Sequence, residues 1–173
     1  MTRTMLMPMT APAGSASFAS SLAALVFAIM LGALAGCGDD APPGVPIFPA
    51  DYRGSYVEVR NCRQSADHDL HMIRVLADPL AAAPYTGRDA PIPEGAILVK
   101  EEYDFGDFDC TGPIVSFAAA RKRAVDSDPD NLDWEWQRLD PARRVIVEDE
   151  PRCVGCHTSC EEPDGYDHTC AVP

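Results

Sequence analysis

The chain has 173 residues, of which 27 are acidic and 14 basic, so its formal net charge at pH 7 is −13. Such an excess of negative charge repels nucleic acid and anionic lipid head groups, and neither is expected as a partner. Hydrophobic residues make up 46% of the chain, which suits one domain with a modest core.

The first 36 residues, 1–36, have the features of a bacterial signal peptide. Arg3 is their only charged residue. The apolar run 22–34, about 13 residues long, matches a signal-peptide core and is too short to span a bilayer comfortably. It ends in the sequence LAGC at 34–37, which resembles the lipobox of bacterial lipoproteins. That resemblance implies cleavage before Cys37 and acylation of this residue; an ordinary secretory signal with a chance cysteine is the alternative.

Residues 37–50 are expected to form a flexible tether between the lipid and the folded domain, because they are rich in proline and glycine. Each buried methylene of an acyl chain contributes about 0.8 kcal/mol, so several chains hold a protein on a bilayer without a spanning helix. The folded domain is expected to occupy residues 51–173. Its expected location is the bacterial cell envelope, anchored to the membrane and facing the periplasm or the cell surface.

The domain is expected to be mainly β, of α+β type, with an antiparallel sheet and a few short helices. A helical turn is predicted near Tyr52, with Val59 still at helical spacing, and another at 80–85, where three alanines favour it. Aspartate-rich segments at 104–112 and 126–131 predict loops. The predicted strands share alternation or β-branched and apolar content; they are 71–78, 96–103, 114–120, 133–138 and 143–148.

Four cysteines lie outside both the lipobox and a C-terminal CxxC motif: Cys62, Cys110, Cys160 and Cys170. An even set in a chain bound for an oxidising compartment predicts two disulfides. Three pairings are open in principle. We favour Cys160–Cys170, which closes a short C-terminal loop, and Cys62–Cys110, which ties the start of the domain to its middle. Each would stabilise the fold by about 3–4 kcal/mol in the chain-entropy model.

The run Cys153 to His157 (CVGCH) is the most informative motif, and it lies near the C-terminus. Two thiols can add across the vinyl groups of haem, and a histidine next to the second cysteine can bind the iron. Cys153 and Cys156 are therefore candidate thioether residues of a covalently attached haem c, with His157 as the proximal ligand. A CxxC redox pair would need a βαβ context that the predicted elements lack. A zinc site that included Cys160 and Cys170 would lack paired short spacings.

The sixth coordination position of the iron separates electron carriers from ligand-binding haem proteins. Electron-transfer cytochromes c commonly use a methionine downstream of the motif, but no residue after His157 is a methionine. Met72 lies in a predicted strand, where core packing explains it. His168 is a second candidate ligand, whereas His68 and His71 are interpreted as surface or structural residues. We therefore expect an iron with an open distal face.

Four segments occur in a characteristic order: Tyr52-Arg53, PEGAILVKE at 93–101, DWEW at 133–136 and CVGCH at 153–157. Together they resemble the cytochrome P460 and cytochrome c′-beta family over residues 51–170. The resemblance implies a large antiparallel sheet, a commonly dimeric protein, one c-type haem and a vacant or water-occupied distal site. It also implies a small nitrogen-containing ligand, since members oxidise hydroxylamine or bind nitric oxide.

The resemblance also suggests catalytic residues. Members of the P460 type carry a bond from a lysine to the haem macrocycle, which the c′-beta type lacks. Lys100 lies in the matching strand and is the candidate for this bond; the alternative is a strand lysine with its head in solvent. Glu101, Glu102 or Glu135 could accept a proton from hydroxylamine. Lys100 and Glu101 are taken as the candidate catalytic residues.

Three phenylalanines, Phe105, Phe108 and Phe117, could form an apolar distal cap of the c′-beta kind, although core packing explains them equally well. The leading hypothesis is a lipid-anchored c-type haem protein that binds or oxidises hydroxylamine or nitric oxide. If it turns over, it is a haem-dependent oxidoreductase with a redox partner, which could be a basic protein steered by the acidic surface. A six-coordinate haem electron carrier and a cofactor-free, disulfide-rich structural lipoprotein are the alternatives.

Overall fold

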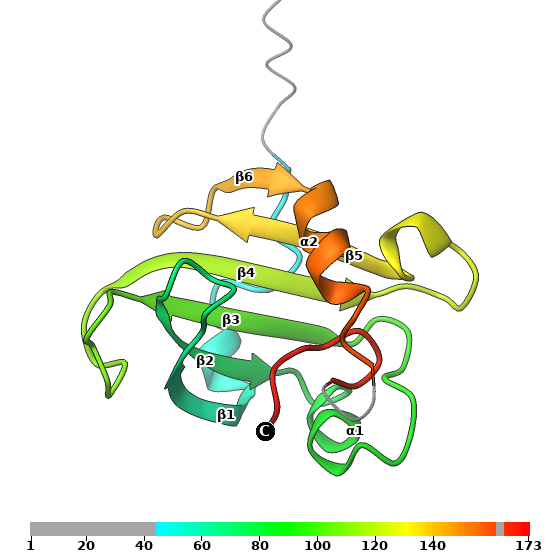
Figure 1. Cartoon of the computed structure of the whole chain (residues 1–173), viewed down its shortest axis with the longest axis horizontal. Coiled ribbons are helices and arrows are strands. Elements are labelled where there is room, and N and C mark those ends of the chain that lie inside the picture. The colour runs from blue at the N-terminus through cyan, green and yellow to red at the C-terminus, as the bar shows by residue number, and fades with distance from the viewer. Residues whose placement is uncertain (1–43, 162–164) are drawn as a thin grey trace, which may run out of the picture. The chain divides into compact units, whose positions relative to one another are not determined.

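The computed structural model describes residues 44–161 and 165–173. The predicted signal peptide, Cys37 and the first part of the predicted tether lie outside the described residues. Six strands form one antiparallel sheet in the order β1-β2-β3-β4-β5-β6 (Figure 1). The strands are β1 (Val57–Gln64), β2 (Met72–Ala77), β3 (Ile97–Tyr103), β4 (Ile114–Lys122), β5 (Trp134–Leu139) and β6 (Val145–Glu148).

The helices are few and short: η1 (Tyr52–Gly54), α1 (Ala82–Gly87), η2 (Pro129–Asn131) and α2 (Pro151–His157). The predicted mainly β fold with an antiparallel sheet is therefore confirmed. Strand β1 was not predicted, because Tyr52 and Val59 lie at near-helical spacing. The helical part is only the 3-10 turn Tyr52–Gly54, and the strand begins at Val57. Within 44–161 and 165–173, no helix has both the length and the apolar character needed to cross a membrane.

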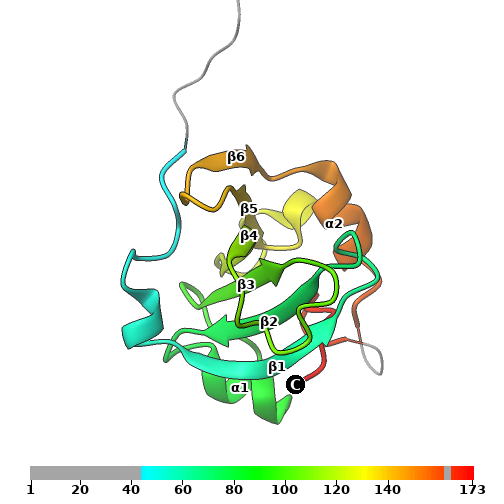
Figure 2. The ribbon, with the colours of Figure 1, turned by 90° about the vertical axis from the view of Figure 1, so that its left-hand side faces the viewer.

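The two faces of the sheet are covered by different parts of the chain. Figure 2 shows η1 and the preceding segment on one side of the strands, and α2 with the C-terminal segment on the other. Because side chains alternate along a strand, neighbours in β3 belong to different cores. Leu98 packs with Val75 and Trp136 on the α2 side, whereas Val99 packs with Phe117 on the η1 side.

The packed part of the chain begins before Asp51. Phe48 is 2% exposed and lies in the core on the η1 side, and Ile47 is 9% exposed. The backbone N–H of Ile47 donates to Oε1 of Gln137 at 2.9 Å, and Nε2 of Gln137 donates to the carbonyl of Val45 at 2.9 Å. This corrects the predicted boundary of the tether, because residues 45–48 are docked on β5 through apolar burial and a buried amide.

Both predicted disulfides are confirmed. The Cα atoms of Cys62 and Cys110 are 5.7 Å apart, and those of Cys160 and Cys170 are 4.7 Å apart. The first joins β1 to the loop between β3 and β4. The second closes the C-terminal segment just after α2, where this segment contributes to the cavity described below.

Candidate haem site

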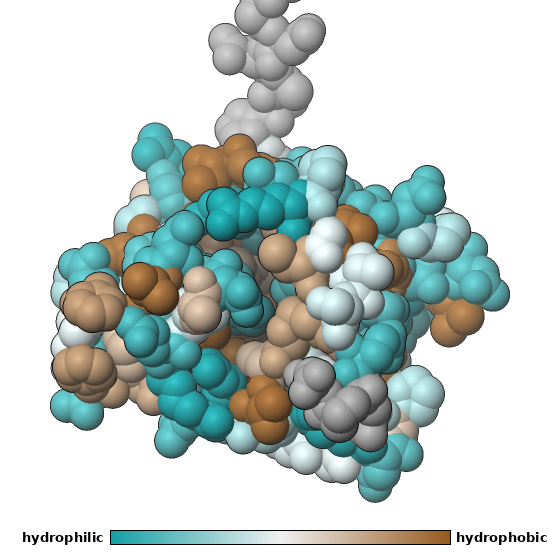
Figure 3. Space-filling model, in the orientation of Figure 1, coloured by the Kyte–Doolittle hydropathy of each residue, from teal (hydrophilic) through white to brown (hydrophobic). Residues whose placement is uncertain are grey.

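A cavity of about 580 Å³ lies on the α2 side of the sheet. Ligand-binding cavities in proteins commonly have volumes of about 300–1,000 Å³. Side chains of β1 to β5 line it from the sheet. Tyr85 of α1, residues 65–69, α2 and residues 169–172 contribute to its other walls. Figure 3 shows this face of the molecule hollowed near its centre. Cys153, Cys156 and His157 all line the cavity.

The sequence around the motif explains why it forms a helix. Pro151 occupies the start of α2, where its fixed φ suits the first turn and its missing N–H leaves no donor unsatisfied. Helical geometry then places Cys153 and Cys156, three residues apart, and His157, four residues from Cys153, on one side of the helix. Both cysteines are free thiols, with Cys153 partly buried and Cys156 exposed. Two thiols are thus available at the cavity for thioether bonds.

The imidazole of His157 is 8% exposed and already has a partner for one ring nitrogen. Its Nδ1 lies 2.5 Å from the backbone carbonyl oxygen of His168, so an Nδ1–H donates to that carbonyl and Nε2 is left as the metal-binding nitrogen. Burial, with the nearby charge of Lys100, lowers the pKa of His157 to about 3. The imidazole is therefore neutral at pH 7, which is the form that binds a metal.

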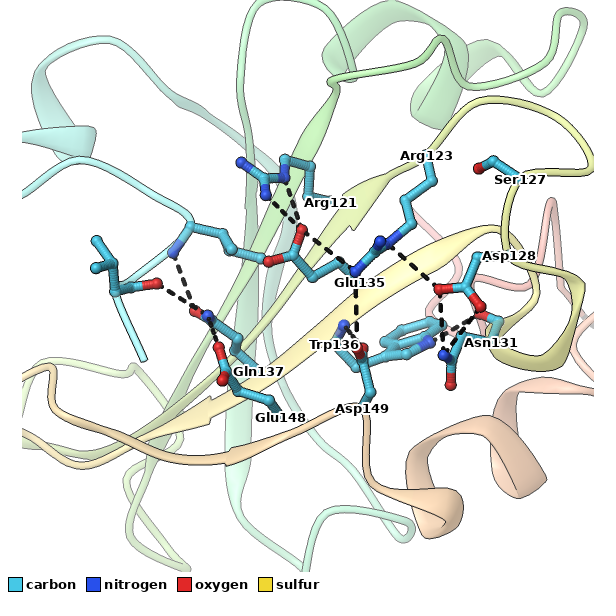
Figure 4. A network of polar contacts seen from close by, with 12 residues as sticks. Arg121, Arg123, Ser127, Asp128, Asn131, Glu135, Trp136, Gln137, Glu148 and Asp149 are labelled. Carbon is cyan, nitrogen blue, oxygen red and sulfur yellow. Dashed lines mark hydrogen bonds and ion pairs between the residues drawn. The ribbon is translucent and has the colours of Figure 1, made fainter. Parts of the chain in front are cut away.

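Trp136 packs against His157, with ring centroids 4.4 Å apart. A polar network fixes this tryptophan (Figure 4). Its indole N–H donates to the carbonyl of Asn131 at 3.1 Å, and its backbone N–H donates to Oδ1 of Asp149 at 2.8 Å. Arg123 lies within 3.7 Å of the Asp149 carboxylate. The wall behind the histidine is consequently held by groups from three separate segments.

A hydrogen-bonded group of side chains around Glu102 also lines the cavity. Nζ of Lys100 lies 3.1 Å from Nε2 of His68, and Nδ1 of His68 lies 2.7 Å from Oε1 of Glu102. Ser116 donates its hydroxyl to the other oxygen of Glu102, and His71 lies 3.6 Å from that oxygen. Lys100, His68 and Glu102 all line the cavity. His68, which the sequence led us to interpret as a surface or structural residue, therefore lies in the wall of the cavity.

Burial dominates the electrostatics of this group. It lowers the pKa of Lys100 to about 8, although the charge of Glu102 opposes the change. Burial and the charge of Lys100 also lower the pKa of His68. Burial alone would raise the pKa of Glu102, but hydrogen bonds from His68 and Ser116 outweigh it and lower the pKa to about 2. At pH 7 the amine of Lys100 is therefore mostly protonated, and the imidazole of His68 is neutral and accepts the hydrogen bond from Lys100.

Glu101 does not line the cavity, which corrects its assignment as a candidate catalytic residue. It lies on the η1 face of β3 and is fully buried. Arg53 and Arg74 donate to it from 2.6 Å and 2.5 Å, Tyr103 donates from 2.6 Å, and Tyr52 also donates. Alternation along the strand points its carboxylate away from Lys100.

The three phenylalanines proposed as a distal cap do not line the cavity either. Phe105 and Phe108 are 69% and 68% exposed in the loop between β3 and β4. Phe117 is buried on the η1 face, where its ring lies 5.6 Å from that of Phe48. The part of β4 that does face the cavity carries the small residues Ala118 and Ala120.

The remaining candidates for iron or proton chemistry are occupied elsewhere. Met72 is buried with Tyr103 and Cys110 in a separate cluster. The imidazole of His168 pairs with Glu161 at 3.1 Å. Its backbone carbonyl, not its side chain, accepts the hydrogen bond from Nδ1 of His157. Glu135, which neighbours Trp136 in β5, pairs with Arg121 of β4. None of these three side chains is among the described residues that line the cavity.

The donor set of the cavity fits a c-type haem. It has two free thiols, an imidazole with Nε2 available, apolar sheet residues and buried cationic groups. A family model described as cytochrome P460 matches residues 49–166, which include every strand, α2 and the CVGCH run. No curated protein matches the chain.

Proposed function

We propose that this chain, which belongs to the cytochrome P460 family, binds or oxidises hydroxylamine or nitric oxide at an open distal position of its covalently attached haem. The observation that carries the proposal is the geometry of α2. Cys153, Cys156 and His157 line one cavity, and the hydrogen bond of Nδ1 of His157 to the carbonyl of His168 leaves its Nε2 able to bind a metal. When bound, the haem supplies an iron that coordinates the nitrogen ligand and exchanges electrons.

The residues of the chain have separate tasks in this proposal. Cys153 and Cys156 hold the cofactor through thioether bonds, and His157 is the proximal ligand. Lys100 and Glu102, not Glu101, are the polar side chains of β3 that line the cavity. The amine of Lys100 can hold a proton, and His68, 3.1 Å away, can accept one. Lys100 is also the residue that would carry the lysine–haem bond of P460-type members.

An open distal position is supported by how the polar side chains of the cavity are used. No methionine is among the described residues that line it. The imidazole of His68 has both ring nitrogens engaged, one by Glu102 and one by Lys100. A six-coordinate electron carrier would require His68 or Lys100 to abandon these bonds and bind the iron.

The test is ligand binding by protein produced in a host with haem-attachment machinery. Carbon monoxide or nitric oxide should shift the Soret band of the ferrous protein readily, and hydroxylamine should reduce an added one-electron acceptor only when the protein is present.

The two lysines of the chain provide a matched pair of variants. Lys100→Gln should change the reaction with hydroxylamine, whereas Lys122→Gln, whose amine pairs with Asp167 at 2.8 Å, should not.

A ferrous spectrum that carbon monoxide and nitric oxide leave unchanged would contradict the proposal and favour the electron carrier. Mass spectrometry of the fragment that contains Lys100 distinguishes the two family types. A haem-linked Lys100 identifies the P460 type, and a free Lys100 identifies the c′-beta type.

We further propose that Cys37 is acylated after removal of residues 1–36, so that the domain is held at a membrane of the bacterial cell envelope. The support is the sequence LAGC at 34–37 after an apolar run. Wild-type protein should then fractionate with membranes, and Cys37→Ser should be recovered in the soluble fraction. Equal fractionation of both proteins would contradict lipid anchoring and leave the haem proposal untouched.

A further inference from the structure

Three arginines line the cavity without any carboxylate partner among the described residues: Arg60, Arg63 and Arg138. In a chain with 27 acidic and 14 basic residues, cations that remain unpaired are unusual. Of the four acidic residues that line the cavity, Asp69 pairs with Arg152 and Glu102 with His68; the other two are Asp67 and Glu150. The cavity therefore offers guanidinium groups that an anionic ligand could satisfy.

Arg60 is the most conspicuous of the three. One of its terminal nitrogens donates to the carbonyl of Ile73 at 3.4 Å, while its Nε is buried and has no hydrogen-bond partner. Burial and the neighbouring charge of Arg63 both lower the pKa of Arg60. Arg63 is exposed and bonds only to the amide oxygen of Asn61, at 2.7 Å. Two guanidinium groups thus repel each other at one end of the cavity.

Strand register shows where the third arginine lies. Arg60 pairs with Val75, Val75 with Lys100, Lys100 with Ala118, and Ala118 with Arg138. These five residues form one row across the sheet from β1 to β5. With about 4.8 Å between neighbouring strands, the ends of the row are roughly 19 Å apart at the backbone. Arg60 and Arg138 therefore lie at opposite ends of the cavity.

The position of α2 distinguishes the two ends. Trp136, two residues before Arg138 on β5, packs against His157 of α2, and Arg138 also acts electrostatically on Cys153, so Arg138 lies at the thioether end of the cavity. The charged and titratable neighbours of Arg60 are Arg63 and Tyr85, at the other end, and Lys100, in the middle of the row. In haem, the two vinyl groups that react with cysteines occupy one half of the porphyrin, and the two propionates occupy the other. The propionates must therefore point away from the cysteines.

We propose that Arg60 and Arg63 bind the two haem propionates. This assignment rests on the proposed function, because it requires a haem joined to Cys153 and Cys156. Two carboxylates carried on one edge of the ligand match two adjacent guanidinium groups on one strand. Arg60, which is partly buried, makes the stronger interaction, and Arg63, which is exposed, makes a weaker one screened by solvent.

The experiment compares ferric and ferrous holoproteins of the wild type, Arg60→Gln, Arg60→Gln/Arg63→Gln and Arg138→Gln. Arg138→Gln is the matched control, because it removes the same charge from the same row at the thioether end. Resonance Raman spectroscopy follows the bending band of the propionates. Potentiometry follows the midpoint potential against pH. Covalent haem content is measured by mass spectrometry for every protein.

With covalent haem at the wild-type level, Arg60→Gln should shift the propionate band, and the double variant should shift it further. The loss of a neighbouring cation raises the pKa of a propionate. The midpoint potential of these variants should therefore fall more steeply with rising pH, at about pH 5–8, than that of the wild type. Arg138→Gln should leave the propionate band unchanged. Arg60→Lys should lie between the wild type and Arg60→Gln in both the propionate band and the pH dependence of the potential. Lysine keeps the positive charge but lacks the planar guanidinium group.

A shifted band in Arg138→Gln with unchanged Arg60 variants would overturn the assignment, and so would unchanged bands in all variants. If the wild-type protein carries no covalent haem, the proposed function fails and the assignment falls with it. Haem content thus separates the two failures.

Discussion

Glu101 and Glu102 are consecutive residues of β3, and both are almost completely buried carboxylates with a pKa lowered to about 2. They differ in the face of the sheet on which they lie. Glu101 is enclosed on the η1 side by two arginines and two tyrosines. Glu102 lies on the cavity side, where it binds His68 and Ser116 and, through His68, reaches Lys100.

The difference teaches that a buried, charged residue is not by itself a sign of chemistry. The donors around Glu101 come from η1, β2 and β3, and they tie the N-terminal segment to the sheet with no outlet to a cavity. One partner of Glu102 is the imidazole of His68, which can gain or lose a proton and which in turn contacts Lys100 in the cavity. We therefore interpret Glu101 as a structural residue and Glu102 as part of the functional cavity.

The largest expected effect is on stability, from Glu101→Ala. Removal of this carboxylate leaves Arg53 and Arg74 without their buried partner, which should cost about 3–5 kcal/mol of unfolding free energy. Chemical denaturation measures the change. Glu58→Ala is the control, because Glu58 is half exposed and its carboxylate is as far as 3.8 Å from the guanidinium of Arg74. This variant should lose under about 1 kcal/mol of unfolding free energy. Equal losses in the two variants would contradict the structural role of Glu101.

Acid should remove the contribution of both carboxylates. Each has a folded-state pKa of about 2 and an ordinary value of 4.5, so each stabilises the fold fully above pH 4.5. Protonation removes this stability as the pH falls from about 4.5 to about 2, on the order of 3 kcal/mol for each group. Denaturation at a series of pH values should show the decline, and it should be smaller in Glu101→Gln. If Glu101→Gln lost as much unfolding free energy at low pH as the wild type, the hydrogen bonds assigned to the Glu101 carboxylate would be contradicted.

A smaller effect is expected from His68→Gln on the cavity side. The variant loses the hydrogen bonds to Glu102 and Lys100, which together should lower the unfolding free energy by about 1–2 kcal/mol. Its distinguishing effect should be spectroscopic, since the Soret region of the holoprotein should change while covalent haem content stays the same. An unchanged spectrum would place His68 outside the surroundings of the cofactor.

The smallest expected effect is a titration shift. Selective ¹³Cε labelling of lysine gives two NMR signals, from Lys100 and Lys122, which Lys122→Arg assigns. In the haem-free protein, the Lys100 signal should titrate near pH 8, because burial lowers its pKa. Glu102→Gln should lower this midpoint further by removing a negative charge, and Glu101→Gln should leave it unchanged. A midpoint above about 10 would indicate an amine in water and contradict the cavity position.

Local patterns predicted much of this fold. Alternation and β-branched content located five of the six strands, and the CVGCH run and four remaining cysteines indicated the haem segment and both disulfides. Strand β1 was missed because the aromatic residues before it repeat at helical spacing. Ile47 and Phe48 were assigned to the tether because their neighbours are proline and glycine, while their burial depends on distant residues of β5.

The polar wall of the cavity could not be predicted from local pattern. The alternation of β3 separates Lys100 from Glu101, but it does not say which face carries the cavity. His68 lies in the loop between β1 and β2. It reaches Lys100 of β3 only because this loop lies over the cavity face of the sheet. Arg60 and Arg138 are far apart in sequence and share a row only through the register of five strands.

The central claim is that the α2 cavity holds a haem joined to Cys153 and Cys156, and one measurement tests it directly. Trypsin cleaves after Arg152, so the fragment from Cys153 to Pro173 contains the whole motif. Protein made with haem-attachment machinery should yield this fragment with the mass of one haem added, and the haem should resist extraction by acidified acetone. A fragment of unmodified mass, or a haem that is extracted freely, would contradict the account.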